Sequence, residues 1–350
     1  MSDATNELEQ LLTDSAERLF GNEVTLAQSE AMERGEFPHA LWQTVEASGL
    51  TRVLAREEDG GANASWAEAL PVLLAAARTV APVPFIETAT ATWLLSRLGM
   101  PVPAGPIALA DLGAEPEARR AGDDWTLTAE VEVPWGRHAP HVLVRARGVW
   151  LLLPTESCRV SEDANIAGEA RDELSFINVT AVASATGAPR ARFDDPAALG
   201  ALMCAIQIAG VLERVLDQTV RYATERIQFG RPIGKFQAIQ QQLAVLANEV
   251  VAARMAVASA CAAMAGDDWV RHAMIAKIVC GLAAGRVPAI AHQVHGAIGF
   301  TREHSLHYAT RRLWSWRAEY GSEAQWAARL GAQAIRDGGA ALWPRMTEAA

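Results

Sequence analysis

Helical periodicity from residue 197 onward constrains this chain more than any other feature. Apolar residues recur there at the spacing of a helix face. The pattern predicts four long helices, at residues 197–224, 236–265, 269–292 and 305–335. Short connections join them, so neighbouring helices should run antiparallel. We therefore expect a C-terminal four-helix bundle over residues 197–340.

Residues 1–100 predict a helical N-terminal domain. Helical stripes occur at residues 7–20, 38–48, 66–80 and 87–98. The paired glycines Gly60 and Gly61 predict a loop ahead of the third stripe, because glycine pairs interrupt regular structure.

Residues 101–190 predict a small middle β domain. Helix-length stripes are absent there, and short apolar runs stand between Gly, Pro and Asp residues. Strands are expected at residues 125–128, 141–145 and 149–153, and residues 187–196 are expected to be the linker out of this domain. The whole chain is therefore expected to be α+β and mostly α.

Composition and charge exclude several classes of protein. The net charge of −10 provides no basic surface for a nucleic acid. Residues 1–20 are acidic and amphipathic, unlike a signal peptide. No run of eighteen or more consecutive apolar residues occurs, so we expect no transmembrane helix and no membrane partner.

The cysteines predict a reduced, cytoplasmic protein without a metal site. The four cysteines share no metal-ligand spacing. Cys204, Cys261 and Cys280 lie in Ala-rich apolar runs, where a free thiol usually acts as a small hydrophobic group.

Two segments of the C-terminal half indicate a binding function. Residues 221–240 have the sequence RYATERIQFGRPIGKFQAIQ, in which one helix ends, the chain turns, and another begins. Residues 293–303 have the sequence QVHGAIGFTRE, a glycine loop before the last helix. Glycine loops at helix ends can bind anions through backbone N–H groups. Each segment alone is also typical of an ordinary interhelical corner.

In this order the two segments resemble the acyl-CoA dehydrogenase family. The family has Arg-x-x-Phe-Gly at the end of its first C-terminal helix and Gln-x-His-Gly-x-x-Gly-Phe/Tyr-Thr before its last one. Residues 41–50, 57–61 and 82–88 also resemble the family's N-terminal domain, so the resemblance covers nearly the whole chain. It implies the family fold and FAD-dependent α,β-dehydrogenation of an acyl-CoA thioester.

The resemblance also implies which residues bind the cofactor. Arg226, Phe229, Gln293 and Gly296 match family residues that contact the adenosine diphosphate half of FAD, across a subunit interface, on the neighbour's flavin. An arginine suits pyrophosphate because its guanidinium is a fixed cationic fork. A glycine suits it because the backbone can approach closely.

The middle domain departs from the family pattern. Family members usually carry a Thr-Glu-Pro-x-x-Gly-Ser-Asp loop that grips the flavin ring and the acyl-CoA. The corresponding stretch is residues 107–117, which keeps Glu115-Pro116 but has no Gly-Ser-Asp after it. Binding of the flavin ring by this chain is therefore not expected from the resemblance.

The catalytic base departs from the pattern as well. Most family members have a glutamate where this chain has Tyr320, and others have it where this chain has Gly200 beside Ala201. Glu319 is one residue from the first position, about 100° away on a helix. If the match between this chain and the family pattern is shifted by one residue, Glu319 is the candidate base. Without that shift, Glu319 is a solvated charge on a helix.

These retained and missing motifs favour one subunit of a heteromeric acyl-CoA dehydrogenase. Some bacterial members, notably those acting on steroid side-chain CoA thioesters, resemble α2β2 assemblies in which one subunit type keeps the flavin ring site and the base. By that resemblance a second family member would be the partner, and an electron-transfer flavoprotein or similar acceptor would take the electrons.

Two alternatives stand beside it. The first is a self-sufficient homotetrameric acyl-CoA dehydrogenase that uses Glu319 as its base. The second is a non-catalytic scaffold, which ranks last because it would have no use for Arg226, Phe229 and Gln293.

Overall fold

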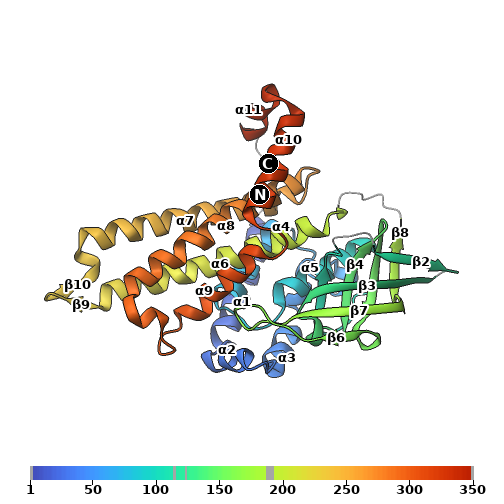
Figure 1. Ribbon diagram of the computed structural model, residues 1–350, viewed down its shortest axis with the longest axis horizontal. Coiled ribbons are helices and arrows are strands. Elements are labelled where there is room, and N and C mark those ends of the chain that lie inside the picture. Colours follow the sequence, from blue (N-terminus) through green and yellow to red (C-terminus); the bar gives the residue numbers. More distant parts are fainter. Residues whose placement is uncertain (1–2, 113–115, 123, 187–192, 348–350) are drawn as a thin grey trace. The chain divides into compact units, whose positions relative to one another are not determined.

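The structure, a computed structural model, describes residues 3–112, 116–122, 124–186 and 193–347. The chain forms two compact units (Figure 1), and each is described by itself. The first comprises Met1–Ala76 and Ala81–Met203, and the second comprises Ala77–Val80 and Cys204–Ala350. The expected α+β class with a helical majority is confirmed.

Helices form the N-terminal part of the first unit. They are α1 (Asp3–Glu23), α2 (Leu26–Glu33), α3 (His39–Ala47), α4 (Trp66–Arg78) and α5 (Phe85–Leu98). The four expected stripes correspond to α1, α3, α4 and α5, whereas α2 was not expected. A capping box of Thr25 and Gln28 begins α2, which is too short to show a clear apolar period.

The loop at Gly60 and Gly61 is confirmed. The structure also shows why each position is a glycine. Gly60 has φ +78°, in the left-handed region that favours glycine. A Cβ on Gly61 would lie 2.1 Å from the carbonyl oxygen of Ala55 and 2.4 Å from that of Arg52. The loop folds back so closely on its own backbone that only glycine fits at position 61.

Two four-stranded sheets follow among the described residues. The strands are β1 (Ile107–Ala110), β2 (Glu117–Ala121), β3 (Asp124–Pro134), β4 (His141–Ala146), β5 (Val149–Pro154), β6 (Arg159–Ser161), β7 (Arg171–Thr180) and β8 (Ala183–Thr186). One sheet has the order β1-β4-β5-β8, in which β1 and β4 are parallel, and the other has the order β2-β3-β7-β6. The three expected strands are confirmed within β3, β4 and β5.

The core of the β part lies between these two sheets. Leu151 and Leu153 of β5 meet Leu174 and Phe176 of β7 there, all fully or almost fully buried. The first sheet is also covered on its other face, where α5 packs against β1 and the Thr88 hydroxyl accepts a hydrogen bond from the Ile107 N–H at 3.2 Å. Burial on both faces explains the unbroken apolar run in β5.

The second unit is the expected helical bundle. Its helices are α6 (Pro196–Glu225), α7 (Gln237–Ala263), α8 (Trp269–His295), α9 (Leu306–Ala318), α10 (Glu323–Asp337) and α11 (Gly339–Thr347). The helix α6 begins in the first unit and continues into the second. Ion pairs join Glu213 of α6 to Arg254 of α7, and Glu249 of α7 to Arg286 of α8. The helices α6, α7 and α8 run successively antiparallel (Figure 1).

The prediction of one last helix at residues 305–335 is wrong. The chain leaves helical geometry at Glu319 (ψ 142°), and Tyr320 and Gly321 both have positive φ. The buried Lys277 ammonium of α8 binds the carbonyl oxygens of Trp316 and Glu319, which closes the end of α9. Ser322 then begins α10 through a capping box.

The expectation that no helix could span a membrane also needs correction. By length and composition alone, three helical segments of the described chain qualify: Pro196–Glu225, Gln237–Ala263 and Trp269–Phe300. Isolated polar residues such as Gln207 interrupt the runs of consecutive apolar residues. The mean hydropathy of each helix nevertheless stays high enough for a membrane-spanning segment. The apolar window of α6 is 83% buried within the chain, whereas that of α7 is only 28% buried.

The cysteines behave as small hydrophobic groups. None of the four is in a disulfide within the described chain, and Cys204, Cys261 and Cys280 are buried in the second unit. Burial raises the pKa of the Cys280 thiol to about 12 and also raises the pKa of the Cys261 thiol. Neither thiol is therefore a nucleophile near neutral pH.

Replacing Gly61 with alanine tests the backbone contact in the first unit. The added methyl group would force the loop away from Ala55, and we expect the free energy of unfolding to fall by about 2–3 kcal/mol. Gly21→Ala is the matched control, because nothing lies within 4 Å of its added Cβ. In α1 that change should stabilise by about 0.5–1 kcal/mol. Equal unfolding midpoints in denaturant for the two variants would contradict this account.

Candidate functional site

The first predicted segment forms an exposed corner between α6 and α7. A short hairpin of β9 (Ile227–Gln228) and β10 (Arg231–Pro232) turns through Phe229 and Gly230, which both have positive φ. Two such residues in a two-residue loop are typical of a type I′ turn. Phe229 is 92% exposed, so this aromatic ring is held outward on a strained backbone.

Arg226 lies at the base of this hairpin. Its N–H donates to Tyr222 at 2.9 Å, and its carbonyl accepts from the Ile233 N–H at 2.8 Å. The side chain is exposed, and within the described chain it forms no ion pair. The corner therefore presents a cation on a hydrogen-bonded backbone, and no carboxylate of the described residues forms an ion pair with it.

The second predicted segment is a turn at the end of α8. Gln293 is exposed near the helix end, and Gly296 follows the last helical residue with φ +63°. Nothing lies within 4 Å of a Cβ built on Gly296. The 3₁₀ turn η7 (Gly296–Phe300) then leads toward α9. The backbone at Gly296 is thus open to a ligand.

Ring stacking brings the two segments together. Tyr222, one turn before Arg226, stacks on His295 with ring centroids 4.5 Å apart and planes 24° apart. Gln218 of the same helix donates a hydrogen bond to the Ser305 hydroxyl at 2.9 Å. The arginine corner and the glycine turn therefore lie at one end of the bundle, as the function inferred for them requires. Tyr222 was not identified from the sequence, because only the packed structure shows its partner.

A cluster of histidines supports the glycine turn. His292 shares a hydrogen bond with the Thr310 hydroxyl at 3.0 Å, and His295 contacts the Ala291 carbonyl at 2.7 Å. Burial lowers the pKa of His292, with a further lowering by His307. Burial also lowers the pKa of His295, and His304 adds to that effect. These imidazoles are therefore held in the neutral form near neutral pH.

The combined corner has the chemistry of a nucleotide diphosphate site. An unpaired guanidinium can bind pyrophosphate by charge-assisted hydrogen bonds. An exposed aromatic ring offers apolar contact, and the open backbone at Gly296 allows close approach. The residues present therefore fit the adenosine diphosphate half of FAD.

The candidate base lies elsewhere in the same unit. Glu319 is half-buried at the end of α9, and its carbonyl oxygen accepts a hydrogen bond from Lys277 at 2.8 Å. Because α9 ends at Ala318, Glu319 and Tyr320 are not on a helix. The expected rotation of about 100° between their side chains therefore does not apply. At the other family position, Gly200 and Ala201 are buried in α6 and bring no carboxylate. Glu319 as the base stays a prediction.

The middle-domain stretch is described only in part. Residues 107–110 form β1 and residues 117–121 form β2. Glu115 lies outside the described residues, so the proposed remnant of the flavin-ring loop has no structural account.

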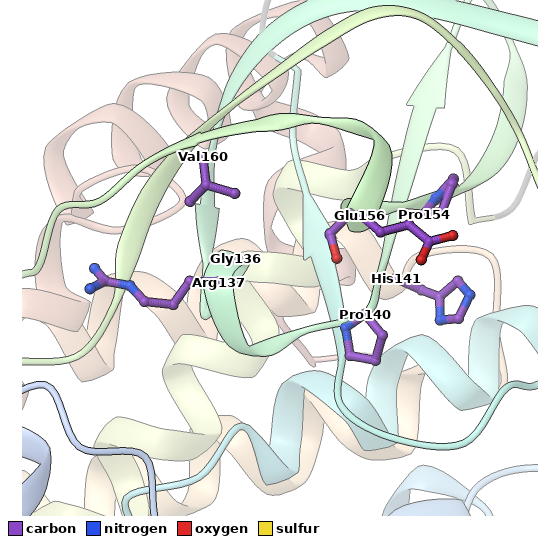
Figure 2. Close-up of a pocket in the computed structure, with 8 residues that line it drawn as sticks. Gly136, Arg137, Pro140, His141, Pro154, Glu156 and Val160 are labelled. Atoms are coloured by element: carbon purple, nitrogen blue, oxygen red, sulfur yellow. The ribbon is translucent and has the colours of Figure 1, made fainter.

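A cavity that the sequence did not predict lies in the β part. It has a volume of about 390 Å³, and Figure 2 shows the residues that line it: Gly136, Arg137, Pro140, His141, Pro154, Thr155, Glu156 and Val160. Arg137 is already paired with Glu162 and the fully buried Asp172. The cavity contains none of the predicted site residues, and its cation is neutralised within the chain.

Two acidic residues of α6 form ion pairs within the second unit. Glu213 pairs with Arg254 of α7. Asp217 pairs with Arg78 and not with Arg221, which lies four residues further along the same helix. The four-residue spacing would allow Asp217 to pair with Arg221, but the Asp217 carboxylate pairs with Arg78 at the end of α4.

Comparisons with known proteins agree with the resemblance. The family description "Acyl-CoA dehydrogenase, N-terminal domain" matches residues 6–101, and "Acyl-CoA dehydrogenase, C-terminal domain" matches residues 195–333. The chain is similar to acyl-CoA dehydrogenase IpdE2 of Mycobacterium tuberculosis, with 30% identity over 288 residues. Those residues are 81% of this chain and 82% of that protein.

Two solved structures share the fold. A variant of the Tcur3481–Tcur3483 steroid ACAD has a TM-score of 0.86 at 24% identity, covering 96% of this chain and 99% of that chain. The ChsE4–ChsE5 complex from Mycobacterium tuberculosis has a TM-score of 0.82 at 24% identity, covering 95% and 97%.

The buried histidines make the stability depend on pH. In the unfolded chain a histidine gains its proton near pH about 6.5. In the fold the pKa of His295 is lower, so the unfolded chain binds more protons below that pH and stability falls. His295→Phe keeps a ring to stack on Tyr222 but cannot titrate. Between pH about 7 and about 5, we expect His295→Phe to lose less unfolding free energy than the unsubstituted protein. Denaturant titration at each pH measures this free energy. Parallel plots of free energy against pH for the two proteins would exclude this role of His295.

Proposed function

This chain belongs to the acyl-CoA dehydrogenase family, oxidoreductases that act on a CH–CH bond of acyl-CoA, and we propose that it is one subunit of a heteromeric, FAD-dependent member. A second family member would hold the flavin ring and supply the base. This chain would complete the adenosine site of that subunit's FAD. The substrate is an acyl-CoA thioester, as for the family.

The observation that carries the proposal is the outward-facing corner at Arg226 and Phe229. Arg226 is exposed and forms no ion pair within the described chain, and the Phe229 ring is 92% exposed, so both side chains are available to a ligand outside their own chain. Residues that served a ligand inside their own chain would be expected to be more buried. The corner thus supports a ligand held between two chains.

The absence of a base at the two family positions supports the same division of roles. Removing the α proton of an acyl-CoA needs a carboxylate close to the α carbon. Gly200 has no side chain to supply one, and Tyr320 carries a phenol in place of a carboxylate. A partner chain with the glutamate would complete the reaction.

FAD, when bound, supplies the acceptor for the two electrons of the oxidation. Within this chain, Arg226 would hold the pyrophosphate, and the open backbone at Gly296 would lie close to the same group. The Gln293 amide, exposed on the last turn of α8, would offer a neutral hydrogen bond. The neutral His295 keeps the turn in place by its stacking on Tyr222.

An apolar surface on α7 and α8 supports association with another chain. Val251 and Met255, one turn apart on α7, are 60% and 64% exposed, and Leu282 of α8 is 43% exposed. Exposed apolar surface of this kind is typical of an interface between chains. A family-type tetramer built through the C-terminal bundle would cover it.

The likeness to two-component structures extends the proposal. The Tcur3481–Tcur3483 and ChsE4–ChsE5 proteins each pair two chains by name, and the first is a steroid ACAD. We extend the proposal to a bulky, ring-bearing acyl-CoA. An electron-transfer flavoprotein or similar acceptor would take the electrons, in the cytoplasm.

The flavin-to-chain ratio tests the proposal directly. Absorbance of the chain purified alone should show little or no FAD, because the ring site belongs to the partner. Co-expression with a family member encoded nearby should give a complex with about one FAD per two chains. About one FAD per chain in the protein purified alone would exclude the heteromer. Loss of turnover in Glu319→Gln would then identify the self-sufficient homotetramer.

Replacing Arg226 with methionine tests the pyrophosphate contact. A charge-assisted hydrogen bond is worth about 1.5–3 kcal/mol, so the dissociation constant of FAD should rise roughly 10- to 100-fold. Arg336→Met is the control, because this arginine is also exposed but lies on α10. Fluorescence titration of the reconstituted complex measures both. Equal affinities would exclude Arg226 from the cofactor site.

A further inference from the structure

Phe300, at the end of the glycine turn, has no role in the function described so far. Its ring stacks on His292, with centroids 4.3 Å apart and planes 21° apart. Phe300 nevertheless remains 71% exposed. One face of the ring is therefore occupied within the chain and the other is open.

The ring is fixed from behind. His292 is buried, its Nε2 lies 3.0 Å from the Thr310 hydroxyl, and its ring also lies 5.9 Å from that of Trp314, with planes 20° apart. Phe300, His292 and Trp314 thus hold nearly parallel planes. A ring backed in this way is prepared to stack on a further planar group with little loss of side-chain entropy.

Gly299 lets Phe300 come this close to His292. A Cβ on Gly299 would lie 3.0 Å from the His295 Cβ and 3.2 Å from the His292 Nδ1. Any side chain there would push the turn away from both histidines. The turn is thereby held against His292 and His295, with its last residue, Phe300, left on the outside.

We propose that Phe300 is a further binding residue, a platform on which the adenine ring of FAD stacks. This inference rests on the proposed function. Phe300 is four residues after Gly296 in a 3₁₀ turn, hence about 8 Å along the axis from the proposed pyrophosphate contact. The purine is the planar, uncharged part of the adenosine diphosphate half. The pyrophosphate is excluded, because the face of an aromatic ring is electronegative.

The test measures FAD and ADP binding in the assembly that carries FAD. Phe300→Ala should raise the dissociation constant of FAD about tenfold, and the inhibition constant of ADP as a competitor by the same factor. Phe300→Trp should restore both, because every aromatic face can stack on a base. Trp343→Ala is the matched control, since Trp343 is 70% exposed on α11, and it should change neither constant.

Three results would overturn the stacking. The first is an unchanged dissociation constant of FAD in Phe300→Ala. The second is a raised dissociation constant of FAD in that variant with an unchanged inhibition constant of ADP. The third is dissociation of the assembly that contains Phe300→Ala, seen in sedimentation. The last would mean that a partner chain covers Phe300. If Arg226→Met weakens FAD and Phe300→Ala does not, the proposed function stands and only the stacking fails. If neither weakens FAD, the adenosine site itself is wrong.

Discussion

The stacking of Tyr222 on His295 holds the candidate site together. One ring belongs to the end of α6 and the other to the end of α8, and each lies within one turn of a residue with a proposed cofactor role. Because His295 is neutral, the contact carries no charge that would repel the nearby Arg226. Together with the hydrogen bond from Gln218 to the Ser305 hydroxyl, this contact joins the arginine corner to the glycine turn.

Much of the fold follows from local pattern, and what does not follow depends on distant partners. The long helices α6, α7 and α8 were predicted to within a few residues, because each is a long, mostly apolar segment that ends at a turn containing glycine. The break after Ala318 was missed, since Lys277 of another helix stabilises the end of α9. The strand β7 was missed because it begins with Arg171 and Asp172, which are charged but buried.

The candidate site divides in the same way. Arg226, Phe229, Gln293 and Gly296 were identified from two motifs, and the structure places the two segments at one end of the bundle. Phe300 stood within the second motif, yet its importance depends on the rings behind it. Those rings are supplied by His292 of α8 and Trp314 of α9, which no local pattern joins.

The hairpin turn at Phe229 has a cost that the fold alone does not explain. A turn with positive φ at both central residues favours Asn-Gly, and a bulky aromatic in the left-handed region is strained. An asparagine at position 229 would suit the backbone better and would remove a large apolar ring from water. In the proposed role of Phe229 this strain would be a trade-off between stability and cofactor binding, and stabilising the chain by Phe229→Asn would then weaken the site.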